Sequence, residues 1–517
     1  MSDWSAGYVS ELGYTYGYYE ELNTSRVELC LLNKGVQPPK ISHALELGFG
    51  QGVSVNIHAA ASDVVWAGTD FNPSQANFAR QLAEQSGATT YLYDASFQEF
   101  LASDLTPEFQ FIGLHGIWSW ISDANRQAIV DIIREKLAVG GVVYMSYNTL
   151  PGWASFAPMR HLMTQHAKVL GSAGEGIINR IDDAFHFSER LFDLNPKYLR
   201  ANPQAAERIK KIKEQNRHYL AHEFFNEDWH PMHFSAVAEL LTEAKLEFAA
   251  SATYSDHVDD IHFTAEQRQF LSDIPDAALR ETSKDFILNQ QFRKDFWIKG
   301  PMRLAPLERA LRLRDIKVAL LIPAGEVQLK MTGSLGEISF NESVYRPIID
   351  LLSDHKIRAI GEIEDHFAVS EGSSGPKITL AQITQAVVLL LGTNQVALAQ
   401  GEAVASAVTT QTAALNAFLL DKAKYSNDVA HLASPVTGGG VGANRFEMLF
   451  LQAVAEGATD PKLWAESAWR VLSSQGHRLV NNGVPLESDQ ENLQELTSKA
   501  TDFAAKRLVT FKTLGII

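Results

Sequence analysis

Several features that mark other classes of protein are scarce in this chain of 517 residues. Its single cysteine, Cys30, excludes an internal disulfide and a cysteine-rich zinc site. Its longest apolar run, at residues 386–392, is far shorter than the roughly 20 residues that a membrane-spanning helix needs. The first residues lack the basic and then apolar segments of a secretory signal. We therefore expect a cytoplasmic protein with no stable membrane insertion.

Positive charge is also scarce. The chain has 45 lysines and arginines against 61 aspartates and glutamates, which gives a net charge of −16. Because nucleic-acid binding depends on basic residues that neutralise phosphates, this balance argues against a nucleic-acid partner. It is compatible with a basic substrate drawn to an acidic cleft, and equally with a charge that only provides solubility. The histidines lack partners at the spacing of metal ligands, so we expect no metal site.

The most informative segment that is present reads I-S-H-A-L-E-L-G-F-G-Q-G at residues 41–52. An apolar strand carries Glu46 near its end and runs into Gly48, Gly50 and Gly52. A glycine-rich turn between a buried strand and a helix lets the backbone approach a nucleotide-like ligand closely. A structural turn in some other α/β domain is the alternative.

Two further acids end apolar runs. Asp70 follows Gly48 by 22 residues and can accept hydrogen bonds from ribose hydroxyls, and Asp94 closes a third strand. Dinucleotide sites favour Gly-x-Gly-x-x-Gly, and Glu46 would repel a diphosphate. An acid there suits a ligand with a cationic centre and an amino group. S-adenosylmethionine has both, and we expect it as the cofactor.

The order of apolar runs predicts an α/β fold. Strands near 42–48, 64–70, 89–93, 109–114 and 141–147 alternate with helices, which is typical of a doubly wound parallel sheet. A helix and strand within 233–252 and an antiparallel strand at 292–298 would complete it. We divide the chain into a cap (1–40), a cofactor-binding core (41–152), a helical insertion (153–225), a completion of the core (226–300), a winged-helix-like module (301–400) and a helical C-terminal domain (401–517).

The module at 301–400 is predicted from helices near 344–355, 357–368 and 379–391. Residues 341–400 hold four lysines and arginines against seven acids, so protein contact or packing is favoured over nucleic-acid binding. The glycine-rich stretch 435–442 lacks the Lys-Ser/Thr of a phosphate loop and is interpreted as a mobile linker.

Other segments contain sequence motifs that are more specific than the chemistry of their residues alone. They are H-G-I-W-S-W at 115–120, Y-N-T-L-P-G-W at 147–153, H-E-F-F-N-E-D-W-H-P-M-H-F at 222–234 and D-F-I-L-N-Q-Q-F-R at 285–293. Up to about residue 300 the chain resembles class I S-adenosylmethionine-dependent methyltransferases that carry a methyltransferase regulatory domain. Its full layout resembles bacterial protein-lysine methyltransferases of outer-membrane proteins.

The resemblance implies a role for each position that matches. The segment from Glu46 to Gly52 would hold the methionine part of the cofactor, and Asp70 would bind the ribose. Phe71 would pack on the adenine, although a core position is equally compatible with it. The adenine edge would lie near Asp94 and Ala95, and the methyl-transfer site near Leu114, His115 and Gly116.

Aromatic faces stabilise cations, so aromatic residues are candidates for the pocket of a lysine acceptor. Trp118, Trp120, Tyr16 and Tyr18 are the candidates, with core packing as the competing role for each. Trp118 follows a strand end and is expected to face the transferable methyl group. His115 is a candidate general base or wall residue, and the wall is favoured. The cluster at 222–229 is expected to lock the insertion to the core.

The leading functional hypothesis is a protein-lysine N-methyltransferase that acts on a bacterial outer-membrane protein with accessible lysines. A homodimer is an additional expectation. One alternative is a small-molecule N- or O-methyltransferase, and another is a cofactor-binding regulator without catalysis. The intact acids and glycines at 46–94 argue against the regulator.

Overall fold

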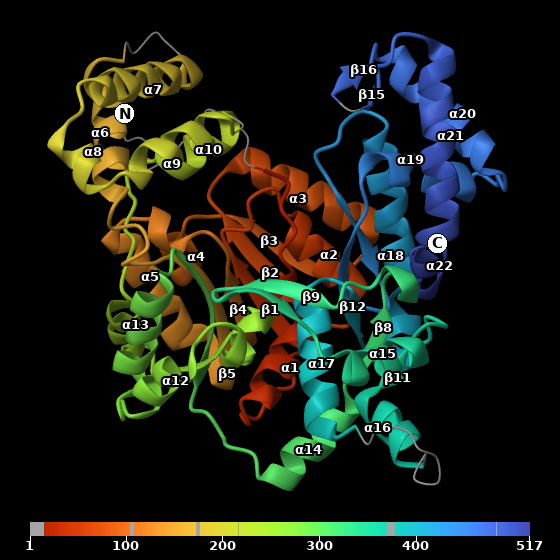
Figure 1. Ribbon diagram of the computed structural model, residues 1–517, viewed down its shortest axis with the longest axis horizontal. Coiled ribbons are helices and arrows are strands. Elements are labelled where there is room, and N and C mark those ends of the chain that lie inside the picture. The colour runs from red at the N-terminus through yellow and green to blue at the C-terminus, as the bar shows by residue number, and fades with distance from the viewer. Residues whose placement is uncertain (1–14, 104–107, 172–175, 216, 370–377, 482) are drawn as a thin grey trace.

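The computed structural model describes residues 15–103, 108–171, 176–215, 217–369, 378–481 and 483–517. Figure 1 shows a central sheet with helices around it, the helical insertion at the upper left and the last helices of the chain at the upper right. The arrangement matters for function because the insertion and the C-terminal half flank the sheet that carries the glycine-rich turn.

The central sheet has seven strands in the order β3-β2-β1-β4-β5-β7-β6. Strands β1 to β5 are parallel, and β7 runs antiparallel between β5 and β6, so the predicted parallel sheet and its reversed last strand are confirmed. The strands are β1 (His43–Leu47), β2 (Val65–Asp70), β3 (Thr90–Asp94), β4 (Phe109–Leu114), β5 (Leu137–Asn148), β6 (Leu246–Ser251) and β7 (Phe292–Lys299).

Helices cover both faces of this sheet because side chains alternate along each strand. In β1, Leu45 and Leu47 join the core of one face, and Ala44 joins the core of the other. The face of Ala44 is covered by α1 (Thr24–Asn33), α2 (Val53–Ala61) and α3 (Pro73–Ser86). The opposite face is covered by α4 (Phe97–Leu101), α5 (Asp123–Lys136) and α11 (Phe234–Thr242).

Between β6 and β7 the chain forms η3 (Tyr254–His257), η4 (Asp259–Ile261), α12 (Ala265–Ser272) and α13 (Ala277–Leu288). Two other short 3-10 turns, η1 (Glu20–Leu22) and η2 (Trp118–Trp120), lie close to the glycine-rich edge of the sheet.

The insertion has a hydrophobic core of its own, built around Phe156, Met163 and Phe185. It is joined to η2 of the catalytic core through Trp229, whose ring lies 5.2 Å from that of Trp153 and 6.1 Å from that of Trp120. This contact agrees with the expected locking role of the 222–229 cluster. The helices are α6 (Ala157–Val169), α7 (Ile177–Asp193), α8 (Lys197–Ala201), α9 (Gln204–Lys213) and α10 (Arg217–Phe224).

The segment 301–400 shares one hydrophobic core with the α1 face of the sheet: Ile348 and Val387 belong to the same cluster as Val27 and Phe111. The three predicted helices are present, and the winged-helix assignment stays a prediction. The elements are α14 (Pro306–Asp315), β8 (Lys317–Leu320), η5 (Ala324–Glu326), β9 (Lys330–Gly333), β10 (Gly336–Ser339), α15 (Glu342–Leu351), β11 (Arg358–Ala359), α16 (Ile360–Val369), α17 (Leu380–Gly392) and β12 (Val396–Ala399).

The last part of the chain packs on the outer side of α2 and α3, where Leu415 and Leu432 meet Ile57 and Leu82. Its elements are α18 (Glu402–Ala423), β13 (His431–Ser434), β14 (Gly439–Gly442), α19 (Arg445–Ala455), α20 (Pro461–Ser474), β15 (Val480–Asn481), β16 (Val484–Pro485), α21 (Asp489–Lys506) and α22 (Leu508–Thr513).

The prediction of a mobile linker at 435–442 is wrong. These residues belong to the β13–β14 hairpin, which packs against Tyr18 and His58. A Cβ atom at Gly439 or Gly440 would lie within 3.0 Å of the Tyr18 side chain, so the glycines permit a close approach.

One helix among the described residues, α18, is long and apolar enough by length and composition to cross a membrane. In this structure it packs against α2 and α3, and 33% of its most apolar window is buried.

Candidate cofactor cleft and acceptor cavity

The glycine-rich turn after β1 forms one wall of a cleft at the carboxyl ends of the parallel strands. Gly48, Gly50 and Gly52 have φ angles of 71°, 55° and 70°, a left-handed conformation that costs other residues roughly 1–2 kcal/mol. At Gly48 a Cβ atom would also lie 2.4 Å from Ile117, which lines the cleft. Gly52 has a different role: a Cβ there would lie 2.3 Å from that of Ala79, so it lets α2 approach α3.

Asp70, at the end of β2, lines the cleft and is hydrogen-bonded to the glycine-rich turn. Its carboxylate accepts hydrogen bonds from the backbone N–H groups of Gly50 (2.8 Å) and Asn72 (3.0 Å). Burial raises the pKa of Asp70 to about 6, and the two backbone hydrogen bonds oppose that rise. The predicted ribose-binding residue therefore lines the cleft and also fixes the glycine turn.

Glu46 lies beneath the turn and is 1% exposed. Burial and the neighbouring Asp70 raise its pKa well above the usual range, and its Oε2 has no hydrogen-bond partner among the described residues. A ligand with an ammonium group would satisfy this oxygen and favour the carboxylate form. The buried acid thus fits the methionine part of S-adenosylmethionine.

The adenine side of the cleft is lined by Phe71 after β2 and by Ala95 and Phe97 after β3. Asp94 differs from the prediction: its side chain is exposed and does not line the cleft.

His115, after β4, forms the far wall together with Tyr19, a residue that the sequence analysis missed. The two rings are stacked with centroids 3.8 Å apart, and His115 Nδ1 lies 2.8 Å from the hydroxyl of Tyr144. Burial lowers the pKa of His115 to about 4, so its ring is neutral at physiological pH. A neutral ring does not repel a sulfonium, which agrees with the wall role.

The segment 15–19 has no helix or strand, and its side chains alternate between two environments. Thr15, Gly17 and Tyr19 line the cofactor cleft. Tyr16 instead packs edge-on against Phe78 at 5.3 Å, so its predicted place in the pocket is wrong. Tyr18 lies between His58 and His431, away from the cofactor cleft but in the wall of an adjoining cavity.

The expected position of Trp118 is also wrong. Its side chain is fully buried in the hydrophobic core shared with α5, because η2 turns it inward after the strand. Leu114 is likewise a core residue, and only its neighbours His115, Gly116 and Ile117 line the cleft. Trp120, also predicted for the acceptor pocket, lines the cofactor cleft instead and is not among the residues that line the adjoining cavity.

The adjoining cavity, of about 600 Å³, shares Tyr19 and His115 with the cofactor cleft. Its other walls come from three parts of the chain: Glu20 and Glu21 in η1, Lys294 in β7, and residues of β12 and the β13–β14 hairpin. Burial alone would raise the pKa of Glu21, but Arg26 and Lys294 outweigh it and hold the pKa at about 2. An ionised acid therefore lies beside the shared wall.

This sheet order, with the last strand reversed between the fifth and sixth, and a glycine-rich cleft at this edge are those of class I S-adenosylmethionine-dependent methyltransferases. A family model described as a predicted methyltransferase regulatory domain matches residues 216–299. The chain thus has the fold and the cleft of that class of enzyme, and the residues around the cleft fit its cofactor.

Similar proteins extend the comparison over the whole chain. The uncharacterized protein sll1526 of Synechocystis sp. is 39% identical over 99% of both chains. The uncharacterized protein RP789 of Rickettsia prowazekii is 24% identical over 55% of this chain and 50% of its own. The solved structure of PKMT2 from Rickettsia typhi in complex with AdoHcy covers 95% of this chain and 98% of its own, with a TM-score of 0.67 at 15% identity. The chain belongs to the family of the Synechocystis protein, and it shares its full-length fold with PKMT2.

Proposed function

We propose that the protein is a protein-lysine N-methyltransferase that acts on a bacterial outer-membrane protein. The observation that carries the proposal is the cavity beside the cofactor cleft, whose walls come from the catalytic sheet and from the C-terminal half together. An enzyme for a small substrate does not need the C-terminal half there. The likeness to PKMT2, whose name abbreviates protein-lysine methyltransferase, covers the same two halves.

S-adenosylmethionine, when bound, supplies a methyl group on a sulfonium for direct displacement by a neutral amine. Glu46 and Asp70 would hold it by its amino group and ribose, and Phe71 would pack on its adenine. Tyr19 and His115 line both this cleft and the adjoining cavity, so the two spaces meet at this stacked pair. A lysine side chain that entered the adjoining cavity would approach the methyl group at the edge of this pair, where the two spaces meet.

The adjoining cavity would bind the lysine side chain and then favour its neutral form. The ring faces of Tyr18 and Tyr19 would stabilise the cationic ammonium group. Glu20 and Glu21, which pair with Arg26 and Lys294 of the same cavity, would offer it carboxylate oxygens. Removal of water at the shared wall then lowers the pKa of the ammonium, so that it loses its proton before transfer. His115 stays neutral throughout and orients the wall through Tyr144.

The test is transfer of a labelled methyl group from S-adenosylmethionine to a bacterial envelope fraction, with the labelled residues mapped by mass spectrometry. We expect label on lysine side chains of outer-membrane proteins. The Asp70→Asn protein, which loses a charged acceptor in the cofactor cleft, serves as the control and should transfer much less.

Label that appears only in small molecules would contradict the proposal and support the small-molecule alternative. Binding of the cofactor without any transfer would support the regulator. A cytoplasmic location, a homodimer and the absence of a nucleic-acid partner complete the proposal. The acidic net charge supports the last of these.

A further inference from the structure

Strand β12 borders the adjoining cavity with a free edge. The small sheet of the C-terminal half has the order β11-β8-β12, so among the described residues β12 pairs with β8 alone (Figure 1). Val396, Ala397 and Leu398 of this strand line the same cavity as Tyr18 and Tyr19. A free strand edge presents N–H and C=O groups that can pair with another chain.

The hydrogen bonds at the start of β12 determine which of its backbone groups face β8. The N–H of Leu321 donates to the carbonyl of Gln395, which makes residues 395 and 321 a hydrogen-bonded pair of the antiparallel ladder. Such pairs alternate with pairs whose backbone groups point outward. Val396 and Leu398 therefore direct their N–H and C=O groups away from β8.

The outward edge of β12 faces the β13–β14 hairpin. Gln400 belongs to the same alternating set as Val396 and Leu398, and its N–H donates to the carbonyl of Val436 in the hairpin turn (2.8 Å). The outward groups of Val396 and Leu398 have no hydrogen-bond partner in the part of the chain that the structure describes. Backbone groups in such a position need a partner from water or from a ligand.

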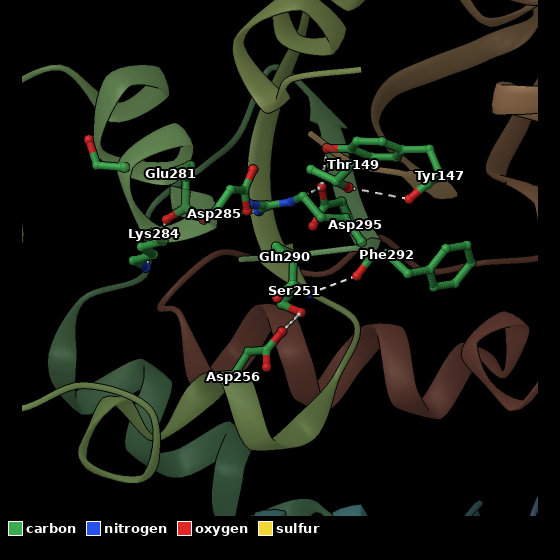
Figure 2. A network of polar contacts seen from close by, with 12 residues as sticks. Tyr147, Thr149, Ser251, Asp256, Glu281, Lys284, Asp285, Gln290, Phe292 and Asp295 are labelled. Atoms are coloured by element: carbon green, nitrogen blue, oxygen red, sulfur yellow. Dashed lines mark hydrogen bonds and ion pairs between the residues drawn. The ribbon is translucent and has the colours of Figure 1, made fainter. Parts of the chain in front are cut away.

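The charges of the cavity, by contrast, are already compensated. Its three cations each have a carboxylate partner: Arg26 with Glu20, Lys294 with Glu21, and Arg507 with Glu447. The strand that carries Lys294 also holds a paired network. Figure 2 shows Asp285 and Glu281 on α13 facing Asp295 on β7, and the guanidinium of Arg293 donates to all three acids. The groups left to recognise a peptide are the free edge of β12 and the aromatic rings.

Building on the proposed function, we propose that the protein substrate binds as an extended segment that adds a strand to β12, with its target lysine directed to Tyr18 and Tyr19. The segment would pair with Val396 and Leu398 at the usual spacing of about 4.8 Å between strands. Because these bonds involve the main chain, lysines in different sequences would be accepted. Lysines on folded helices would be excluded, since their main-chain groups are already paired.

The test is binding of a fluorescein-labelled heptapeptide, Thr-Val-Thr-Lys-Thr-Val-Thr, to the full-length protein saturated with S-adenosylhomocysteine, measured by fluorescence anisotropy. Four further peptides each carry one N-methyl group, at four successive backbone amides that begin with the residue before the lysine. The N-methyl group removes a donor and blocks strand pairing, so it should weaken binding about tenfold at every second position. At the positions between, the amide points away from β12 and binding should stay within about threefold.

A proline variant identifies the strand that pairs. Val396→Pro removes an outward N–H and leaves the ladder to β8 intact, and proline is tolerated on edge strands. It should weaken binding of the unmodified peptide about tenfold and leave the affinity for S-adenosylhomocysteine within about twofold. The matched control is Val480→Pro on β15, whose amide also points away from its partner strand, because the neighbouring pair of Leu479 and Leu486 is the hydrogen-bonded one. It should leave both affinities within about twofold.

Three results would overturn the proposal: no saturable binding of the unmodified peptide, equal effects of N-methyl groups at adjacent positions, or equal peptide affinity in the two proline variants. A Val396→Pro protein that no longer binds S-adenosylhomocysteine is misfolded, and the methylated peptides then decide on the unaltered protein. None of these readouts depends on methyl transfer. Alternating effects without any transfer to lysine would support the added strand and refute the proposed function, and transfer with equal effects would do the reverse.

Discussion

Replacement of Tyr19 by alanine should impair methyl transfer far more than it impairs cofactor binding. The Tyr19 ring lines both the cofactor cleft and the adjoining cavity, and it stacks on His115 at 3.8 Å with an interplanar angle of 14°. Loss of an aromatic pair costs about 0.5–1.5 kcal/mol, and loss of an aromatic face beside a cation costs about 0.5–2 kcal/mol. Together they predict a loss of roughly 1–3 kcal/mol in the transition state, which corresponds to a decrease of roughly 5–150-fold in kcat/KM.

The assay is transfer of a labelled methyl group to a lysine-containing peptide, with the affinity for S-adenosylhomocysteine measured by calorimetry on the same samples. Tyr19→Phe keeps the ring face and should stay within about threefold of the wild type. Tyr91→Ala, which removes a tyrosine that is 53% exposed on β3, is the matched control and should have no effect. A folded Tyr19→Ala protein with kcat/KM within twofold of the wild type would refute the reasoning.

Three other predictions follow from the site. The raised pKa of Asp70 should make the affinity for S-adenosylhomocysteine increase from pH 5 to pH 7. The free protein should lose stability as the pH rises from about 4 through 6, because the folded state binds the proton more tightly than the unfolded state. Calorimetric affinities and unfolding free energies that do not change with pH would contradict this. Trp118→Ala should lower the free energy of unfolding in urea by about 3–5 kcal/mol, since the ring is fully buried. Unchanged stability together with a loss of methyl transfer would instead place Trp118 in the acceptor pocket. The rate of methylation should show no ionisation of His115 between pH 5 and pH 8, because burial lowers its pKa to about 4; a His115→Gln protein that alters the profile in that range would disprove the neutral wall.

The sheet and the cofactor cleft could be predicted because local signals determine them. Apolar runs that end in glycines or acids mark the carboxyl ends of the parallel strands. Asp70 and Phe71 line the cleft at these ends, and Glu46 lies buried in β1 beside it. Side-chain direction just outside a strand has no such signal. Trp118 and Trp120 are two residues apart in one motif, yet the turn η2 buries the first and leaves the second at the cleft.

The N-terminal tyrosines show a second limit. Alternation with a period of two is visible in the segment 15–19, but the sequence does not tell which set faces the cleft. The choice depends on partners that are hundreds of residues away: Tyr18 is held by Gly440 and His431 of the β13–β14 hairpin, and Tyr19 then has to face His115. The same distant contact explains why the glycine-rich stretch could not be distinguished from a linker.

These long-range contacts imply that the two halves of the chain act as one unit. The α1 face of the sheet completes its hydrophobic core with residues such as Ile348 and Val387, so a fragment cut near residue 300 would expose that face. Such a fragment would also lose the part of the adjoining cavity's wall that β12 and the β13–β14 hairpin provide. Binding of the proposed lysine acceptor should therefore depend on the packing of the C-terminal half against α1.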